Sequence, residues 1–312
     1  MGNLLRIEFL KIRRRPRTWI MAILMILVMA VFAPIAPHLI PAPEATWKQD
    51  TIKANEDIKQ LLASNSLPEE AKVALRAELA MNTYNIEHDL PKTQGNAWRY
   101  LDFSSGVLLL TTVFVIIIAG DTISSEFSWG TIKLLLIRPT SRSKIMYSKY
   151  IAALVMSVLF TLLTFVGTYV IGGLFFGFGG FDQPYAYLNP DGIVQMTTLW
   201  KHVVLEYGVN LLQMVMYVTL AIMLSAVFRS SAMAIAIPAL LLLSGPQLIL
   251  FLKKNAWVKY TLMANTNVLS HIEGPTLFQG TTLGFSIGVL AMYFVVFHWI
   301  AWYTFNKRDV AA

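Results

Sequence analysis

Residues 121–149 read DTISSEFSWGTIKLLLIRPTSRSKIMYSK, and this polar segment lies between two long apolar runs. Each flanking run is long enough to cross the hydrocarbon core of a membrane, which needs about 20 mostly apolar residues. Within the segment, Pro139 ends helical structure because it lacks a backbone N–H and clashes with the preceding turn. The segment therefore predicts a membrane protein with a short helix and a polar break between two of its spans.

The composition of the whole chain supports this interpretation. Of the 312 residues, 56% are hydrophobic and only 14% are charged, which is typical of proteins that cross a membrane several times. We expect an all-α membrane protein with six transmembrane helices. The predicted spans cover residues 19–40, 103–120, 148–176, 203–228, 232–251 and 281–305.

The distribution of basic residues predicts the orientation, because Lys and Arg near the ends of spans stay on the cytoplasmic side. Residues 1–17, 121–149, 229–231 and 306–312 together hold 14 of the 25 Lys and Arg residues, but 4 of the 18 Asp and Glu residues. We therefore expect both termini to be cytoplasmic in a plasma-membrane protein. The predicted cytoplasmic parts are an interfacial helix over 1–18, a coupling segment over 121–147 and a tail over 306–312.

The remaining segments are predicted to lie outside the cell. Residues 41–99 have mixed charges and short helical stripes of apolar residues, which predict an extracellular helical hairpin. Residues 177–200 and 252–280 are predicted to be outer loops. On the opposite side, Leu5, Phe9 and Ile12 recur at helical spacing among basic residues, as in an amphipathic helix in the membrane interface.

The polar segment also carries a recognisable pattern, E-x-x-x-G-T-I-K-x-L-L-x-x-P-x-S-R-x-K. Its residues are Glu126, Gly130 to Lys133, Leu135, Leu136, Pro139, Ser141, Arg142 and Lys144. This pattern closely resembles the coupling segment of ABC-type-2 exporter permeases. That family also has six spans, an N-terminal interfacial helix and an outer domain of variable size between the first two spans.

The resemblance implies a function and a set of partners. It implies that the segment docks on a separately encoded ABC ATPase subunit, and that Glu126 sits where the spans, the interfacial helix and the coupling segment meet. It further implies two permease copies, identical or homologous, with two ATPase subunits. The residues expected to transmit force are Glu126, Gly130, Lys133, Arg138, Pro139, Ser141 and Arg142. The alternative is that residues 121–147 form an ordinary cytoplasmic loop, whose basic residues only set the orientation of the spans.

Several kinds of site are absent from the sequence. No segment supplies the phosphate-binding pattern G-x-x-x-x-G-K-[ST], so ATP and its magnesium ion belong to the partner subunit, and we expect no cofactor and no enzymatic activity in this chain. Cysteine is absent, which excludes thiolate metal sites. We attribute the excess of basic over acidic residues to the orientation of the chain in the membrane and to contact with anionic lipid, not to binding of nucleic acid.

Two polar stripes cross the predicted spans. Glu206, Asn210 and Gln213 share one helical face of the fourth span, and Thr161 and Thr164 share one face of the third. Either stripe could line a path for an amphipathic substrate, or it could form hydrogen bonds between helices, each worth about 0.6 kcal/mol. Both alternatives stay open.

The predicted function is that of the permease subunit of an ATP-driven exporter. Few charges lie deep in the spans, which favours an amphipathic substrate, such as a peptide antibiotic, a lipid or a drug-like molecule, over ion-coupled transport. The alternative is a membrane sensor or scaffold that transports nothing and binds a ligand through its extracellular hairpin.

Overall fold

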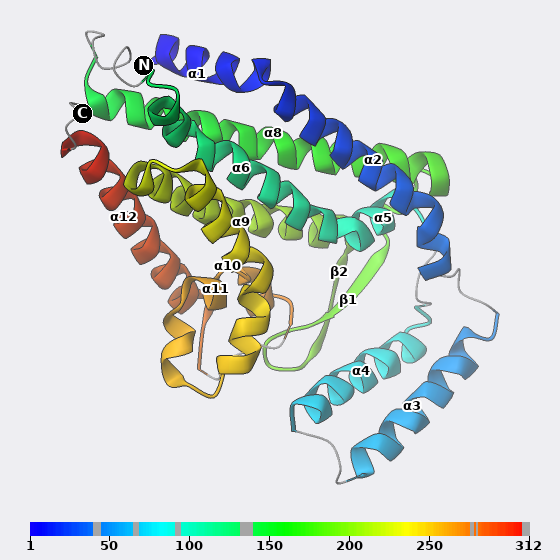
Figure 1. The fold of residues 1–312 in the computed structure, drawn as a ribbon. Coiled ribbons are helices and arrows are strands. Elements are labelled where there is room, and N and C mark those ends of the chain that lie inside the picture. The colour runs from blue at the N-terminus through cyan, green and yellow to red at the C-terminus, as the bar shows by residue number, and fades with distance from the viewer. Residues whose placement is uncertain are drawn as a thin grey trace.

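Six long apolar helices dominate the computed structural model, which describes residues 1–39, 45–64, 69–90, 95–131, 140–274, 278 and 280–307. Each of the six is long and apolar enough to cross a membrane, which is consistent with the expected number of spans and confirms the mainly helical class. They are α2 (Pro16–Leu39), α5 with α6 (Ala97–Phe103 and Val107–Ser128), α8 (Arg142–Phe176), α9 (Leu199–Phe228), α10 (Ser231–Leu252) and α12 (Leu283–Lys307) (Figure 1).

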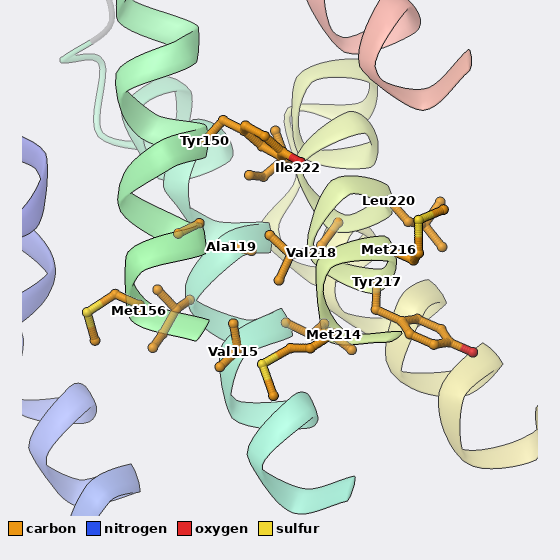
Figure 2. Packing of buried hydrophobic residues seen from close by; sticks show 14 of the residues in the cluster. Val115, Ala119, Tyr150, Met156, Met214, Met216, Tyr217, Val218, Leu220 and Ile222 are labelled. Carbon is orange, nitrogen blue, oxygen red and sulfur yellow. The ribbon is translucent and has the colours of Figure 1, made fainter. Parts of the chain in front are cut away.

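The centre of the bundle is formed by α6 and α9, the two most buried of these helices. Their facing residues pack with residues of α8, as Figure 2 shows for Val115, Ala119, Tyr150, Met156, Met214 and Val218. The helix α10 approaches α6 closely at Gly120, where an added Cβ atom would lie 2.9 Å from the carbonyl oxygen of Ala234. A larger side chain there would force the two helices apart.

The helices on both sides of the polar segment extend into it. The helix α6 continues to Ser128, whereas we ended the second span at residue 120, and α8 begins at Arg142 instead of residue 148. Glu126 therefore belongs to the last turn of a long helix. Residues 132–139, which include Lys133, Arg138 and Pro139, lie outside the described residues.

The helical hairpin predicted within residues 41–99 is present. It consists of α3 (Trp47–Ala63) and α4 (Glu69–Glu87), which are joined by a hydrogen bond of 3.0 Å from Asn82 to Asn55. In Figure 1 this pair stands apart from the long helices. The side of the membrane on which it lies follows from the charge distribution alone and stays a prediction.

The predicted outer loops contain regular structure that we did not expect. Residues 177–200 include an antiparallel pair, β1 (Pro184–Leu188) and β2 (Val194–Thr198). Residues 252–280 include the 3-10 turns η2 (Ala256–Tyr260) and η3 (Val268–His271) around the short helix α11 (Leu262–Asn265).

The bundle has two distinct ends. The helix α1 (Gly2–Arg14), the end of α6, the start of α8 and the end of α12 lie at one end, whereas α5 and the β1–β2 hairpin lie at the other (Figure 1). The 22 residues of α6 span about 33 Å at 1.5 Å per residue, enough to separate the two ends by the thickness of a hydrocarbon core.

Candidate functional site

Buried charges join α1, α6 and α8 at the end of the bundle where the polar segment begins. The ammonium group of Lys149 lies 3.0 Å from Oε1 of Glu126 and 2.9 Å from Oε2 of Glu8. Lys11 approaches the same oxygen of Glu126 at 2.7 Å. We call Glu8, Lys11, Glu126 and Lys149 the ion cluster. Through Lys11 and Lys149, Glu126 is linked to α1 and α8.

Because the ion cluster is largely buried, a substitution of one of its members is expected to destabilise the fold. Lys149 is 1% exposed, and Glu8 and Glu126 are 5% and 4% exposed. The ammonium group of Lys149 also donates to the backbone oxygen of Thr122 at 3.2 Å, so it has three acceptors. Removing one partner of a buried ion pair leaves an uncompensated charge and costs about 3–5 kcal/mol. The three helices are therefore held together as one unit at this end.

A second ionic contact fixes the junction between α1 and α2. The guanidinium group of Arg15 lies 2.6 Å from Oδ2 of Asp121 in α6, and Arg17 contacts the same oxygen. Ser231, the first residue of α10, donates to the other oxygen of Asp121 at 2.8 Å. Burial, followed by the charge of Arg17, lowers the pKa of Arg15. Asp121 thus connects the start of the chain with two helices of the bundle.

The polar segment is anchored at both of its described ends. On one side, Thr131 donates a hydrogen bond to the carboxylate of Glu126, and Gly130 has a φ of +67°, a conformation that favours glycine. On the other side, Ser141 caps α8 by accepting from the backbone N–H of Lys144. Whatever displaces the segment therefore acts on the ends of α6 and α8.

Arg142 extends these contacts to α12. Its Nη1 donates to the backbone oxygen of Asn306 at 3.1 Å. The neighbouring Ser143 lies 3.2 Å from the side-chain oxygen of Asn306 and accepts from the indole N–H of Trp302 at 3.0 Å. The start of α8 is thus bound to the end of the last span.

The two predicted polar stripes have different surroundings. Thr164 lies 2.9 Å from the hydroxyl group of Thr111 in α6, and Thr161 lies 3.9 Å from the sulfur of Met214 in α9; both threonines are buried. These contacts favour the packing alternative for the third span. In the fourth span, Asn210 donates to the backbone oxygen of Glu206 at 3.0 Å, and Gln213 is half-buried.

Sequence reasoning missed Glu8 and Lys149, although the sequence contains a signal for the first. Glu8 lies three residues after Leu5 and four before Ile12, so it interrupts the apolar face of the N-terminal helix. A carboxylate on a buried face needs a cation nearby. Lys149 gave no such signal, because its partners are 141 and 23 residues away in the chain.

The comparisons with known proteins agree with the membrane class. Over its whole length the chain is 37% identical to "Uncharacterized protein YhcI" of Bacillus subtilis (strain 168), all of which is covered. It is 32% identical to "Uncharacterized membrane protein YdbK" of the same organism over 221 residues, which are 70% of this chain and 85% of that protein. Residues 78–311 match the family described as "Protein of unknown function (DUF2705)", and the chain therefore belongs to the DUF2705 family.

Proposed function

We propose that this chain is the permease subunit of an ABC-type-2 exporter, which moves an amphipathic substrate outward with ATP hydrolysed on a separate subunit. The resemblance of the polar segment to the coupling segment of that family first suggests this function. Two copies of the chain, or this chain with a homologous permease, work with two ATPase subunits. The complex lies in the plasma membrane with the polar segment and both termini in the cytoplasm.

The observation that carries the proposal is the position of Glu126. Its carboxylate is bonded to Lys11 of α1, to Lys149 of α8 and to Thr131 at the start of the polar segment. A load applied to the segment is therefore transmitted to three helices at once, because no one of them can shift without breaking a buried charge contact. An ordinary loop between two spans has no need of such an anchor.

The mechanism follows from this arrangement. ATP binding closes the two ATPase subunits, and their movement displaces the polar segment that docks on them. The displaced segment shifts the cytoplasmic ends of α6 and α8 together with α1, and the rearranged spans release the substrate outward. Gly130 has the positive φ angle with which the chain turns away from the end of α6. At the other side, Ser141 caps α8 and Arg142 is its first residue.

Co-purification tests the proposal. The tagged full-length chain is expressed together with the proteins encoded next to its gene, extracted in mild detergent and isolated. We expect an ABC ATPase to co-purify, and its ATP turnover to rise in the presence of the permease and of amphipathic compounds. Isolation of a kinase instead would favour the sensor alternative, and isolation of the chain with no ATPase would contradict the exporter.

A further inference from the structure

A second polar cluster lies at the opposite end of the bundle. His202 and Glu206 come from the first turns of α9, and Asp102 comes from α5. The spacing of four residues places His202 and Glu206 on one face of their helix. The ligand atoms of these three side chains all lie within 4.8 Å of one another. We propose that Asp102, His202 and Glu206 bind a divalent metal ion, for which zinc is the best fit.

The distance between the ligand atoms of His202 and Asp102 suits direct coordination of one metal ion by both. The Nε2 atom of His202 lies 3.2 Å from Oδ1 of Asp102. Two ligand atoms that are each 2.0–2.1 Å from a tetrahedral zinc ion lie about 3.4 Å apart. One histidine with two carboxylates also leaves a fourth position for water. Imidazole suits zinc, copper, iron and nickel, whereas calcium and magnesium favour oxygen ligands alone.

The histidine ring is already held in the orientation that a metal ligand needs. Its Nδ1 atom contacts the carboxylate of Glu273, which directs Nε2 toward Asp102 and Glu206. A carboxylate on the second ring nitrogen is the usual partner of a metal-bound histidine. The ring of Tyr185 stacks on the imidazole with centroids 3.9 Å apart. His202 is 6% exposed, so the surrounding residues fix it firmly.

The charge of this cluster calls for a cation. Asp102, Glu206 and Glu273 bring three carboxylates together, and Arg99 pairs with one oxygen of Asp102 at 2.9 Å. Ser105 lies next to Glu206. Even so, Oε2 of Glu206 is buried and makes no hydrogen bond to any described residue. Three partly buried carboxylates beside Arg99 and His202, one of them with a buried oxygen that accepts no hydrogen bond from a described residue, are stabilised by a bound cation.

The site has a structural consequence that does not depend on transport. Asp102 precedes α6, whereas His202 and Glu206 begin α9, so a bound metal would tie together the ends of the two central helices. Glu273 follows η3 and brings the segment before α12 to the same point. Metal binding is therefore expected to stabilise the end of the bundle that is predicted to face the exterior.

The test uses the full-length chain, purified in detergent, stripped with a chelator and titrated with zinc, manganese and calcium chlorides. We expect one zinc per chain, a higher melting temperature with zinc, and an absorption-edge spectrum with one imidazole nitrogen and oxygen ligands. Zinc affinity should fall at least tenfold in His202→Gln and in Glu206→Gln. It should fall 10- to 100-fold in Glu273→Gln, because this carboxylate orients the ring.

The controls separate this site from adventitious binding. His88→Gln changes an exposed histidine of α4 and should leave zinc affinity unchanged. If His202→Gln does not fold, as judged by gel filtration, the conservative Glu206→Gln decides the matter alone. Absence of zinc binding at 100 μM in the parent chain (about 5.5 kcal/mol of binding free energy) would overturn the proposal. So would equal affinity in Glu206→Gln and the parent chain.

Discussion

Lys149 of α8 and Glu126 of α6 form a buried ion pair of 3.0 Å at the point where the polar segment leaves the bundle. The pair is completed by Glu8 of α1, so that one ammonium group serves two carboxylates. This arrangement makes the docking of α1 dependent on a contact between two spans. It also gives the clearest predictions for the stability of the protein.

Replacement of Lys149 by Met is expected to lower the free energy of unfolding by about 3–5 kcal/mol, because Glu8 and Glu126 would then be buried with less compensation. Denaturant titration of the detergent-solubilised chain measures this change. The control is Lys144→Met, which changes an exposed lysine of the same helix. An equal decrease in the free energy of unfolding in the two variants would show that the ion cluster does not stabilise the protein more than an exposed lysine does.

Replacement of Gly120 by Val is expected to destabilise the contact between α6 and α10 by about 1–3 kcal/mol, the usual cost of overpacking. An added Cβ atom would already lie 2.9 Å from the backbone oxygen of Ala234 and 2.9 Å from Cγ1 of Ile235. The matched control is Gly288→Val in α12, where nothing lies within 4 Å. Thermal unfolding followed by circular dichroism compares them, and equal melting temperatures would contradict the close contact.

Thr111 and Thr164 are expected to be coupled by about 0.6 kcal/mol, as is usual for hydrogen bonds between membrane helices. Their hydroxyl groups lie 2.9 Å apart. A double-mutant cycle with Thr111→Val and Thr164→Val measures the coupling. If Thr164 lines a substrate path instead, Thr164→Val will alter substrate-stimulated ATP turnover while the coupling energy stays near zero.

If the chain is the permease proposed above, Arg142→Glu is expected to abolish stimulation of the partner ATPase and to leave membrane insertion intact, because the segment proposed to dock on that ATPase would lose a basic group. Arg142 also donates to Asn306, so the loss could arise from α12. Ser143→Ala separates these causes, since Ser143 contacts Asn306 and Trp302 as well. Stimulation should survive in Ser143→Ala, and intact stimulation in Arg142→Glu would count against the exporter.

His271 is expected to make the protein less stable in mild acid. Burial lowers the pKa of His271 below its usual 6.5, and its Nε2 lies 3.1 Å from the hydroxyl group of Ser286. Below about pH 6.5 the unfolded chain therefore binds more protons at this residue than the folded chain, and stability falls until the folded pKa is passed. Melting temperatures between pH 7.5 and 5 should decline less in His271→Gln than in the parent chain or in His88→Gln.

The sequence was sufficient for the number and approximate limits of the spans, because an apolar run of the required length has few other structures available to it. It was insufficient for the ends of the helices. The residues after position 120 include Asp121 and Glu126, which we assigned to the cytoplasmic coupling segment. Both are buried in α6, because Arg15 and Lys149 neutralise them from other helices.

The polar clusters could not be derived for a related reason. His202 contacts Asp102 and Glu273, which are 100 and 71 residues away along the chain. Periodicity reports which residues share a face of one helix, but not which face of another helix they meet. The polar stripe through Glu206 was visible in the sequence. The contacts of His202, one turn earlier, could not be predicted, because folding brings Asp102 and Glu273 to it from distant parts of the chain.

The two described ends of the chain lie at the same end of the bundle, since α1 contacts Glu126 and Lys149 while Asn306 of α12 contacts Arg142. Figure 1 places the N and C labels accordingly. Two copies can therefore be joined genetically, tail to head, by a linker that stays at one end of the bundle. Such a concatemer would allow a substitution in one half only, and would reveal whether one unaltered copy is enough for the activity of the proposed pair.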